Sequence, residues 1–239
     1  MTLANSRTPS ALRFDAQGLL TGVIQDPLTG EVRMVGHLSR EALAQTLRTR
    51  LVTFFSRSRN RLWVKGESSG HHLSLHRALA DCDSDALLLF AEPQGPTCHT
   101  GRDACFFRDL EGQGDEPSEA SESAAPFLVT LERSLARRRD ADAGRSYTKS
   151  LLEAGPRRIG EKIVEEAGEL ARALESEDDE RVASEAADLL YHALVGLIAR
   201  RVPLRAVLAT LARRVGTSGH DEKRARSAKP GGEPSASLL

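Results

Sequence analysis

The chain has 239 residues, and its 33 Lys and Arg against 34 Asp and Glu give a formal net charge of −1. Only 4% of the residues are aromatic, so the chain lacks both the basic excess and the aromatic content of a general nucleic-acid binder. No apolar run approaches the roughly 20 residues that cross a bilayer, and the first residues lack the apolar core of a signal peptide. We therefore expect a cytoplasmic protein of one large or two small domains that binds neither nucleic acid nor membranes.

Residues 12–108 have the pattern of a small sheet. Short segments rich in Val, Leu and Phe alternate with turns. The expected strands are 23–26, 31–36, 51–56, 61–65, 72–79 and 86–92. One helix interrupts them, with Ser39 as its predicted N-cap and with Leu43 and Leu47 one turn apart. The pattern predicts an α+β domain with a mainly antiparallel sheet.

The composition changes after this domain. Residues 109–126 contain six acidic residues and no basic ones, which predicts a flexible, disordered linker. Residues 127–215 then show helical periodicity, with a further helix expected to open at Pro203. The two clearest apolar stripes are Ile159, Ile163, Ala167, Leu170 and Leu174, and Val182, Ala186, Leu189, Ala193 and Leu197. We expect a small all-α domain, followed by a disordered tail over 216–239.

The first motif with a chemical meaning is the run 81–85, which alternates carboxylates with other residues. If this segment is extended, Asp81, Asp83 and Asp85 project from one face and Cys82 from the other. Oxygen ligands of this kind suit Mg²⁺. A lone acidic cluster is more often a solvated turn, so the motif needs support from its surroundings.

The second motif is the segment 98–105, which contains Cys98, His99 and Cys105. Thiolate and imidazole are the ligand types that select zinc, and three thiolates would leave a fourth position open for water. A lone buried cysteine is usually inert packing, but all three cysteines of this chain lie beside carboxylates or a histidine, which favours metal binding. Because 15 residues separate Cys82 from Cys98, the spacing does not decide whether one chain closes the site.

A basic segment rich in serine and glycine spans residues 56–70. Arginine side chains and the backbone N–H groups of such turns are good phosphate ligands, although an exposed basic hairpin has the same composition. With two residues of the cysteine segment, the predicted substrate-binding residues are Arg57, Arg59, Lys65, Ser69, Gly70, Thr100 and Arg102.

Three blocks of this half, FFSRSRNRLWVKGESSG, DCDSDALLL and GPTCHTGRDACFF, resemble the signature blocks of phosphoribosyl-AMP cyclohydrolase. The resemblance implies zinc bound by Cys98, Cys105 and a Cys82 supplied by the other subunit of a homodimer. It also implies Mg²⁺ bound by Asp81, Asp83 and Asp85. In that family zinc activates water for attack on C6 of the adenine ring, which opens between N1 and C6. His99 is then a candidate proton shuttle.

Several positions depart from the pattern of that family. Residues 35–39 read Val-Gly-His-Leu-Ser, where an aliphatic residue, Ala, an aromatic residue, Met and Asn are usual. His37 stands where an aromatic residue is usual, His71 where asparagine is usual, and Leu73 where glutamine is usual. If the two histidines line the nucleotide pocket, we expect ring opening that is weaker than in the family and that changes near neutral pH, where histidine takes up a proton.

The helical half contains two pairs of acidic residues, Glu166 with Glu169 and Glu185 with Asp188, each three residues apart and hence on one helix face. Acidic helix faces are usually only solvated. If the two helices pack antiparallel, however, the acidic rows can converge opposite their apolar stripes and hold Mg²⁺ that bridges to a polyphosphate. Lys162, one turn before Glu166, is placed to neutralise phosphate charge.

This half resembles the all-α nucleoside triphosphate pyrophosphohydrolases, and in particular phosphoribosyl-ATP pyrophosphohydrolase. The resemblance rests on LERSLARRR, SYTKSLLEAGPRRIGEKIVEEAGEL and SEAADLLYHALV. It implies Mg²⁺-dependent release of pyrophosphate, with Mg²⁺ held by Glu166, Glu169, Glu185 and Asp188. The predicted catalytic residues are Glu166, Glu169 and Lys162. The order of the two halves resembles the bifunctional enzymes of histidine biosynthesis.

Two alternatives remain open from the sequence. The N-terminal half could have kept zinc and lost turnover, which would leave a monofunctional pyrophosphohydrolase. It could instead be a zinc-stabilised module that binds nucleotides without chemistry. Ultraviolet absorbance distinguishes these alternatives from ring opening, because opening the ring changes the chromophore and binding does not.

Overall fold

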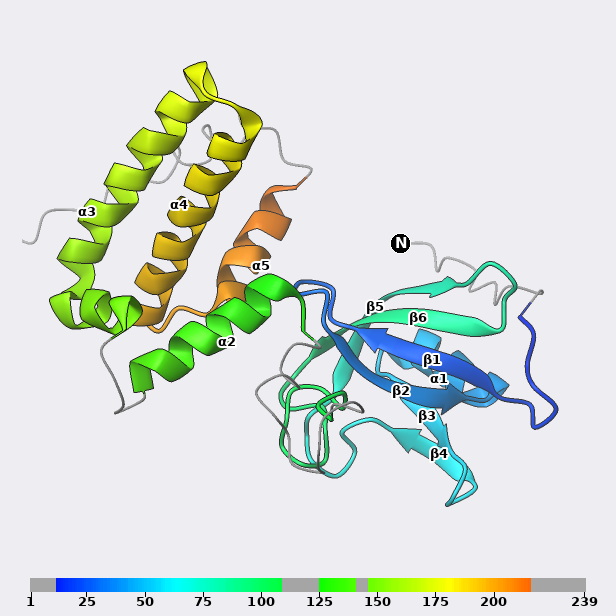
Figure 1. Ribbon diagram of the computed structural model, residues 1–239. Coiled ribbons are helices and arrows are strands. Elements are labelled where there is room, and N and C mark those ends of the chain that lie inside the picture. The colour runs from blue at the N-terminus through cyan, green and yellow to red at the C-terminus, as the bar shows by residue number, and fades with distance from the viewer. Residues whose placement is uncertain (1–11, 109–124, 141–145, 216–239) are drawn as a thin grey trace, which may run out of the picture.

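The computed structural model describes residues 12–108, 125–140 and 146–215. Most of the predicted linker, residues 109–124, and the predicted tail, 216–239, lie outside the described residues. The described part consists of an N-terminal half built on a sheet and a C-terminal half built from helices (Figure 1). The predicted α+β domain followed by an all-α domain is therefore confirmed.

The N-terminal sheet has four strands in the order β2-β1-β6-β5. These are β1 (Leu20–Gln25), β2 (Val32–Leu38), β5 (Leu73–Ala80) and β6 (Ala86–Pro93). The β1–β2 and β5–β6 pairs are antiparallel, as predicted, whereas β1 and β6 run parallel, with Thr21 opposite Ala86. The mainly antiparallel sheet is thus confirmed, and its one parallel pair joins strands that are distant in the sequence.

A helix and a short hairpin cover this sheet. Helix α1 (Arg40–Thr49) begins at the predicted N-cap, where the Ser39 Oγ accepts a hydrogen bond from the Ala42 N–H at 3.1 Å. Strands β3 (Thr53–Ser56) and β4 (Arg61–Val64) form the hairpin. The core between these layers contains Ile24, Leu38, Val52, Phe54 and Leu89, each almost fully buried.

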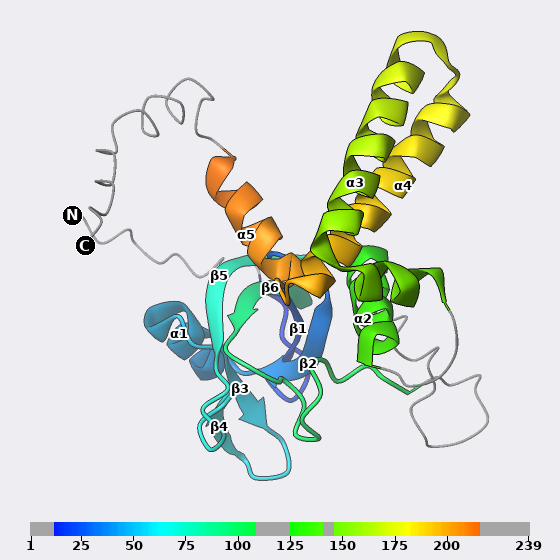
Figure 2. The same ribbon diagram turned by 90° about the vertical axis from the view of Figure 1, so that its left-hand side faces the viewer.

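The C-terminal half consists of α2 (Phe127–Asp140), α3 (Tyr147–Ser176), α4 (Asp179–Ala199) and α5 (Leu204–Arg214). Helices α3 and α4 pack side by side as a hairpin that projects away from the sheet, and α2 and α5 lie nearer to the N-terminal half (Figure 2). Gly155 interrupts α3 with a φ of +85° just before Pro156, so this long helix is kinked near its start.

The buried faces of α3 and α4 differ from the predicted stripes. Leu174 is 67% exposed, whereas Glu166, Glu185 and His192 are buried. The prediction that the acidic rows lie opposite the apolar stripes is therefore wrong. Periodicity counts apolar residues only, and it misses carboxylates that are buried beside a cationic side chain.

Helix α4 is, by length and composition alone, long and apolar enough to cross a membrane, with a mean hydropathy of 1.4 over its most apolar window. This corrects the expectation that no segment approaches that size. Such a helix is weak evidence for a membrane span, and α4 packs along α3 with Glu185 and His192 buried on it.

The central strand β6 offers a test of the N-terminal core. Leu89 is fully buried, and Leu79 on the neighbouring strand is 37% exposed. Replacing Leu89 by Ala removes buried methyl groups and leaves a cavity, so we expect the free energy of unfolding to fall by about 2–5 kcal/mol, against about 1 kcal/mol or less for Leu79→Ala. The single tryptophan, Trp63, lies in this half, so its fluorescence during urea unfolding reports on this domain. Equal midpoints for the two variants would contradict the assigned core.

Candidate active sites

A cavity of about 640 Å³ lies in the N-terminal half between the β3–β4 hairpin, the turn that follows it and the loop after β6. Six predicted site residues line this cavity: Arg59, Lys65, Ser69, Cys98, His99 and Cys105. Four others, Arg57, Gly70, Thr100 and Arg102, are not among its lining residues. We call this space the thiol cavity and the segment 98–105 the thiol loop.

Backbone hydrogen bonds shape the thiol loop. The Cys98 N–H donates to the Arg102 carbonyl at 2.9 Å, and the Gly101 N–H donates to the Cys98 carbonyl at 3.1 Å. The Cys105 N–H donates to the carbonyl of Arg33 at 2.8 Å, which ties the end of the loop to β2. The Thr100 hydroxyl donates a hydrogen bond to the Cys98 Sγ at 3.1 Å, so this predicted substrate-binding residue contacts a thiol of the loop.

The two thiols of the loop differ in acidity. Burial opposes ionisation of Cys98, but hydrogen bonds from the side chain and backbone of Thr100 outweigh it and lower the pKa of this thiol. Burial of the thiol and the neighbouring Cys98 raise the pKa of Cys105 to about 11, although the residue as a whole is exposed. Ionisation is therefore favoured at Cys98, and ionisation of Cys105 beside it calls for a further positive charge, which a bound metal cation would supply.

Lys65 brings a positive charge to the wall of this cavity. Its side chain is buried, and its Nζ donates to the carbonyl of His71 at 3.1 Å. Burial lowers the pKa of Lys65, while Cys105 and Cys98 partly oppose this shift. Gly66 permits the turn, because its φ is +91° and a Cβ there would lie 2.5 Å from the His71 carbonyl group.

Three of the departures from the cyclohydrolase pattern, His37, His71 and Leu73, have different surroundings. Only His71 lines the thiol cavity, where its ring packs against Gly95. Leu73 is 1% exposed within the core, and His37 lies on β2 outside the lining of the cavity. Within the described chain, therefore, only His71 is positioned to touch a ligand in the thiol cavity.

The acidic run 81–85 forms the turn between β5 and β6 and is not extended. Its conformation is fixed by the Asp81 carboxylate, which accepts hydrogen bonds from the Asp85 and Ala86 N–H groups at 3.0 and 3.1 Å. The turn nevertheless brings carboxylate oxygens of Asp81, Asp83 and Asp85 within 4.8 Å of one another. The nearby charge of Asp83 raises the pKa of Asp85, so a cation here would relieve repulsion.

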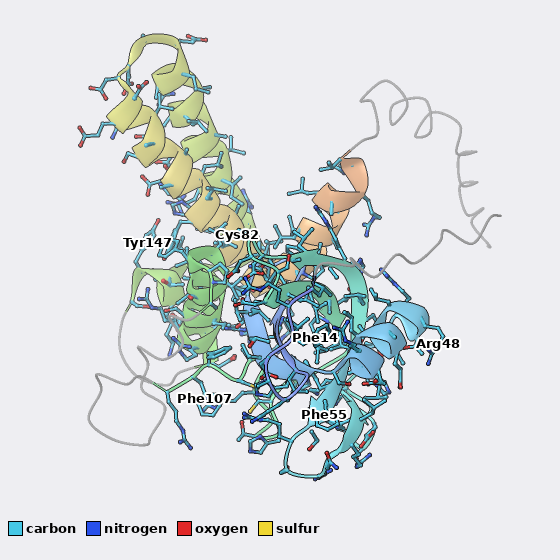
Figure 3. The ribbon with its side chains drawn as sticks, turned by 90° about the vertical axis from the view of Figure 1, so that its right-hand side faces the viewer. Phe14, Arg48, Phe55, Cys82, Phe107 and Tyr147 are labelled. Carbon is cyan, nitrogen blue, oxygen red and sulfur yellow. The ribbon has the colours of Figure 1, made fainter. Side chains whose placement is uncertain are left out.

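Cys82 lies in this same turn, far from the other two thiols. Strand β6 separates the turn from the thiol loop, and its eight residues span about 26 Å at the usual rise per residue. Figure 3 shows Cys82 well apart from Phe107, which follows the thiol loop in sequence. Among the described residues Cys82 thus forms no cluster with Cys98 and Cys105.

The second candidate site lies between α3 and α4. Carboxylate oxygens of Glu166, Glu185 and Asp188 lie within 4.8 Å of one another, and Glu166 and Glu185 are buried. We call these three residues the acidic cluster. Predicted residue Glu169 lies near Glu185, and Lys162 places its Nζ 3.0 Å from the Glu166 Oε1.

Glu185 shows that this cluster fits a cation. Its Oε1 pairs with Arg181 at 2.6 Å, but its buried Oε2 has no hydrogen-bond partner among the described residues. Burial raises the pKa of Glu185; Arg181 opposes this, and Glu169 and Asp188 add to it. An unpartnered buried carboxylate oxygen beside further carboxylates is the donor set that a hard divalent cation satisfies.

His192 and Tyr147 also belong to the surroundings of this cluster, and neither is among the predicted site residues. The His192 Nδ1 lies 2.9 Å from the Asp188 carbonyl and 3.6 Å from the Glu166 Oε1, and its Nε2 lies 3.0 Å from the Tyr147 hydroxyl. The sequence signal for His192 is its spacing, four residues after Asp188 and seven after Glu185, on the same helix face. No comparable signal marks Tyr147, whose position depends on how α3 packs on α4.

Two family models match the chain, one in each half. The model for phosphoribosyl-AMP cyclohydrolase matches residues 34–107, and the model for phosphoribosyl-ATP pyrophosphohydrolase matches residues 128–215. The first range contains the thiol cavity and the acidic turn, and the second contains the acidic cluster. A histidine biosynthesis bifunctional protein HisIE from Wolinella succinogenes is 44% identical over 217 residues, which cover 89% of this chain and 95% of the relative.

The chain belongs to the HisIE family of bifunctional histidine-biosynthesis proteins. Similar relatives include the HisIE proteins of Photobacterium profundum, 47% identical over 74% of this chain and 83% of the relative, and of Vibrio cholerae, 44% identical over 82% and 90%. The chain is therefore a multifunctional enzyme with one hydrolase in each half. Both families are metal-dependent, in agreement with a ligand cluster in each half.

The acidity of Cys98 can be tested directly in metal-free protein. Because the Thr100 hydroxyl lowers the pKa of Cys98, Thr100→Val is expected to raise that pKa and to slow alkylation of Cys98 by iodoacetamide at pH 7–8. Cys105, with a pKa of about 11, stays protonated in this range and reacts slowly in both proteins. Mass spectrometry of the modified peptides gives the two rates, and an unchanged Cys98 rate in the variant would contradict the assignment.

Proposed function

We propose that the acidic cluster binds Mg²⁺ and hydrolyses phosphoribosyl-ATP to phosphoribosyl-AMP and pyrophosphate, and that the thiol cavity binds zinc and opens the adenine ring of phosphoribosyl-AMP. The observation that carries the first part is the buried Glu185 oxygen without a partner beside Glu166 and Asp188. The second part rests on two adjacent thiols of unequal acidity in a cavity of nucleotide size.

In the C-terminal half, Glu166, Glu185 and Asp188 are positioned to hold Mg²⁺, with Glu169 next to them. Bound Mg²⁺ would neutralise the charge of the polyphosphate and assist attack by water. Lys162 donates to Glu166 and Glu165 and adds a positive charge at the edge of the cluster, where it can pair with a phosphate oxygen. Glu169, whose side chain is 36% exposed, is positioned to orient or deprotonate the attacking water.

In the N-terminal half, Cys98 and Cys105 are positioned to hold zinc, which would act as a Lewis acid on water. His99 lines the same cavity, and its Nδ1 lies 3.8 Å from the Cys98 Sγ, so this ring can accept and return the proton that moves during ring opening. Arg59 and Ser69 line the cavity from the hairpin side and offer donors for the phosphate groups of the substrate.

We propose further that zinc is shared between two copies of the chain. Cys82 and the thiol loop lie at opposite ends of β6, which supports a third thiolate supplied by a second chain. Large apolar side chains on the helical hairpin also stay exposed in the single chain: Val164 is 73% exposed, Leu174 67% and Leu190 55%. A homodimer would cover such surfaces and bring a second Cys82 to the thiol cavity.

In such a dimer the turn that contains Asp81, Asp83 and Asp85 would lie beside the partner's thiol cavity, because Cys82 belongs to the same turn. We propose that these three carboxylates bind Mg²⁺ there. A cytoplasmic location is the natural expectation for free thiols and phosphorylated nucleotide substrates. Supplying phosphoribosyl-ATP with both metals, and following both intermediates by chromatography and ultraviolet absorbance, tests the two-step reaction. Accumulation of phosphoribosyl-AMP without ring opening would favour a monofunctional pyrophosphohydrolase.

The acidic cluster makes a sharp prediction. Glu185→Gln keeps the size of the side chain but removes the charge of a buried ligand, so we expect pyrophosphate release to fall by about 100-fold or more. Ring opening of supplied phosphoribosyl-AMP should be unchanged. Glu161→Gln on α3 is the matched control, because Glu161 is exposed and pairs with Arg157 and Arg158 on the same helix. Wild-type pyrophosphate release by Glu185→Gln would remove Glu185 from the metal site.

Sharing of zinc can be tested by complementation. Cys82→Ser and Cys98→Ser chains carrying different tags are co-expressed, and the mixed dimer is isolated by both tags. In a shared arrangement one of its two cavities has all three cysteines, so we expect about one zinc per mixed dimer and about none in either pure variant. If each chain closed its own site, the mixed dimer would hold no more zinc than the pure variants.

A further inference from the structure

Two buried carboxylates of the N-terminal half are paired with arginines of the C-terminal half. Asp26 is fully buried after β1 and accepts hydrogen bonds from Arg33 at 2.6 Å and from Arg205 of α5. Glu31, which is 3% exposed, accepts hydrogen bonds from both terminal nitrogens of Arg133 on α2, at 2.9 and 3.1 Å. Because a buried carboxylate without a counter-charge is strongly unfavourable, these arginines fasten the helical half to the sheet.

Arg133 reaches past this interface to the thiol loop. The Arg133 Nη2, which donates to the Glu31 Oε2, also lies 3.1 Å from the Asp103 Oδ2. Asp103 lies within the thiol loop, two residues before Cys105. The Arg133 side chain of the helical half thus pairs both with Glu31 of the N-terminal half and with Asp103 of the thiol loop.

Arg33, on strand β2 of the sheet, also forms hydrogen bonds with the thiol loop. Its Nη1 donates to the Asp103 carbonyl at 3.0 Å and pairs with Glu31 at 3.1 Å, and its own carbonyl accepts the Cys105 N–H. Arg133 and Arg33 therefore share Glu31 and hold Asp103 through its side chain and its backbone respectively. Removing Arg133 would leave the loop with the sheet-side contact alone.

The space around these contacts adjoins the thiol cavity. A second cavity, of about 360 Å³, is lined by Glu31, Arg33, Asp103, Arg133 and Arg205. Pro96 lines this cavity and the thiol cavity as well, so the segment just before Cys98 forms a wall between the two. The two cavities therefore share a stretch of backbone that leads into Cys98.

We propose that Arg133 is a positioning residue for the cyclohydrolase site, through which the helical half holds the thiol loop in the geometry needed for ring opening. The proposal rests on the proposed function of the thiol loop. It assigns the interface a role in the reaction of the N-terminal half, although α2 itself lies in the pyrophosphohydrolase half.

The test uses the full chain with Arg133→Gln, Asp103→Asn, the double variant and Arg133→Lys. We expect the kcat for opening of phosphoribosyl-AMP to fall about tenfold in each of the first two, with pyrophosphate release unchanged. The double variant should be no slower than either single one, because both substitutions break the same contact. Arg133→Lys should recover part of the rate. Arg158→Gln, which removes an arginine–carboxylate pair within α3, is the matched control and should keep both activities.

Hydrogen exchange supplies a readout that does not depend on activity. In metal-free Arg133→Gln, the Cys105 amide, which is bonded to the Arg33 carbonyl, should exchange about tenfold faster than in the wild type, while β1 amides keep their rates. Unchanged exchange together with unchanged kcat in folded Arg133→Gln would overturn the proposal, as would additive losses in the double variant. Failure of the proposed function would look different, because the wild type itself would then fail to open the ring, while faster exchange in the variant would still establish that Arg133 holds the loop.

Discussion

Negative charge buried among protein atoms has to be matched by positive charge, and this constraint shapes the molecule at three places. Between the halves, Asp26 and Glu31 are matched by arginines. Between α3 and α4, Lys162 and Arg181 each match one oxygen of a buried glutamate, and one Glu185 oxygen is left without a partner among the described residues. At the thiol loop, Lys65 supplies part of the positive charge beside two thiols that resist ionising together.

The difference between these places separates structure from chemistry. Where arginines complete the match, a carboxylate is part of the architecture, as at Asp26. Where the protein leaves the match incomplete, as at Glu185 or Cys105, the site is suited to an external cation. The same reasoning explains why many exposed pairs on α3, such as Arg157 with Glu161, carry little functional meaning, because water already compensates them.

Strand β6 links the chemistry of the N-terminal half to its fold. It pairs with β1 on one side and β5 on the other, and its Leu89 is fully buried in the core. The acidic turn with Cys82 precedes the N-terminal end of β6, and the thiol loop follows its C-terminal end (Figure 1). This central strand therefore separates the acidic turn from the thiol loop, so within the described chain Cys82 does not reach Cys98 and Cys105.

Local patterns in the sequence determined much of this protein. The strand segments, the Ser39 cap and the change to helical periodicity predict both folds, because turn residues and periodicity depend on neighbours in the chain. The two hydrolases follow from the resemblance of the signature blocks to known families. The tertiary structure alone decided three further matters: the parallel β1–β6 pair, the burial of Glu166 and Glu185 between helices, and the reach of Arg133 to Asp103. Each joins residues distant in the sequence, and contacts of that kind depend on packing and on the pairing of buried charge, which leave no periodic trace in a single sequence.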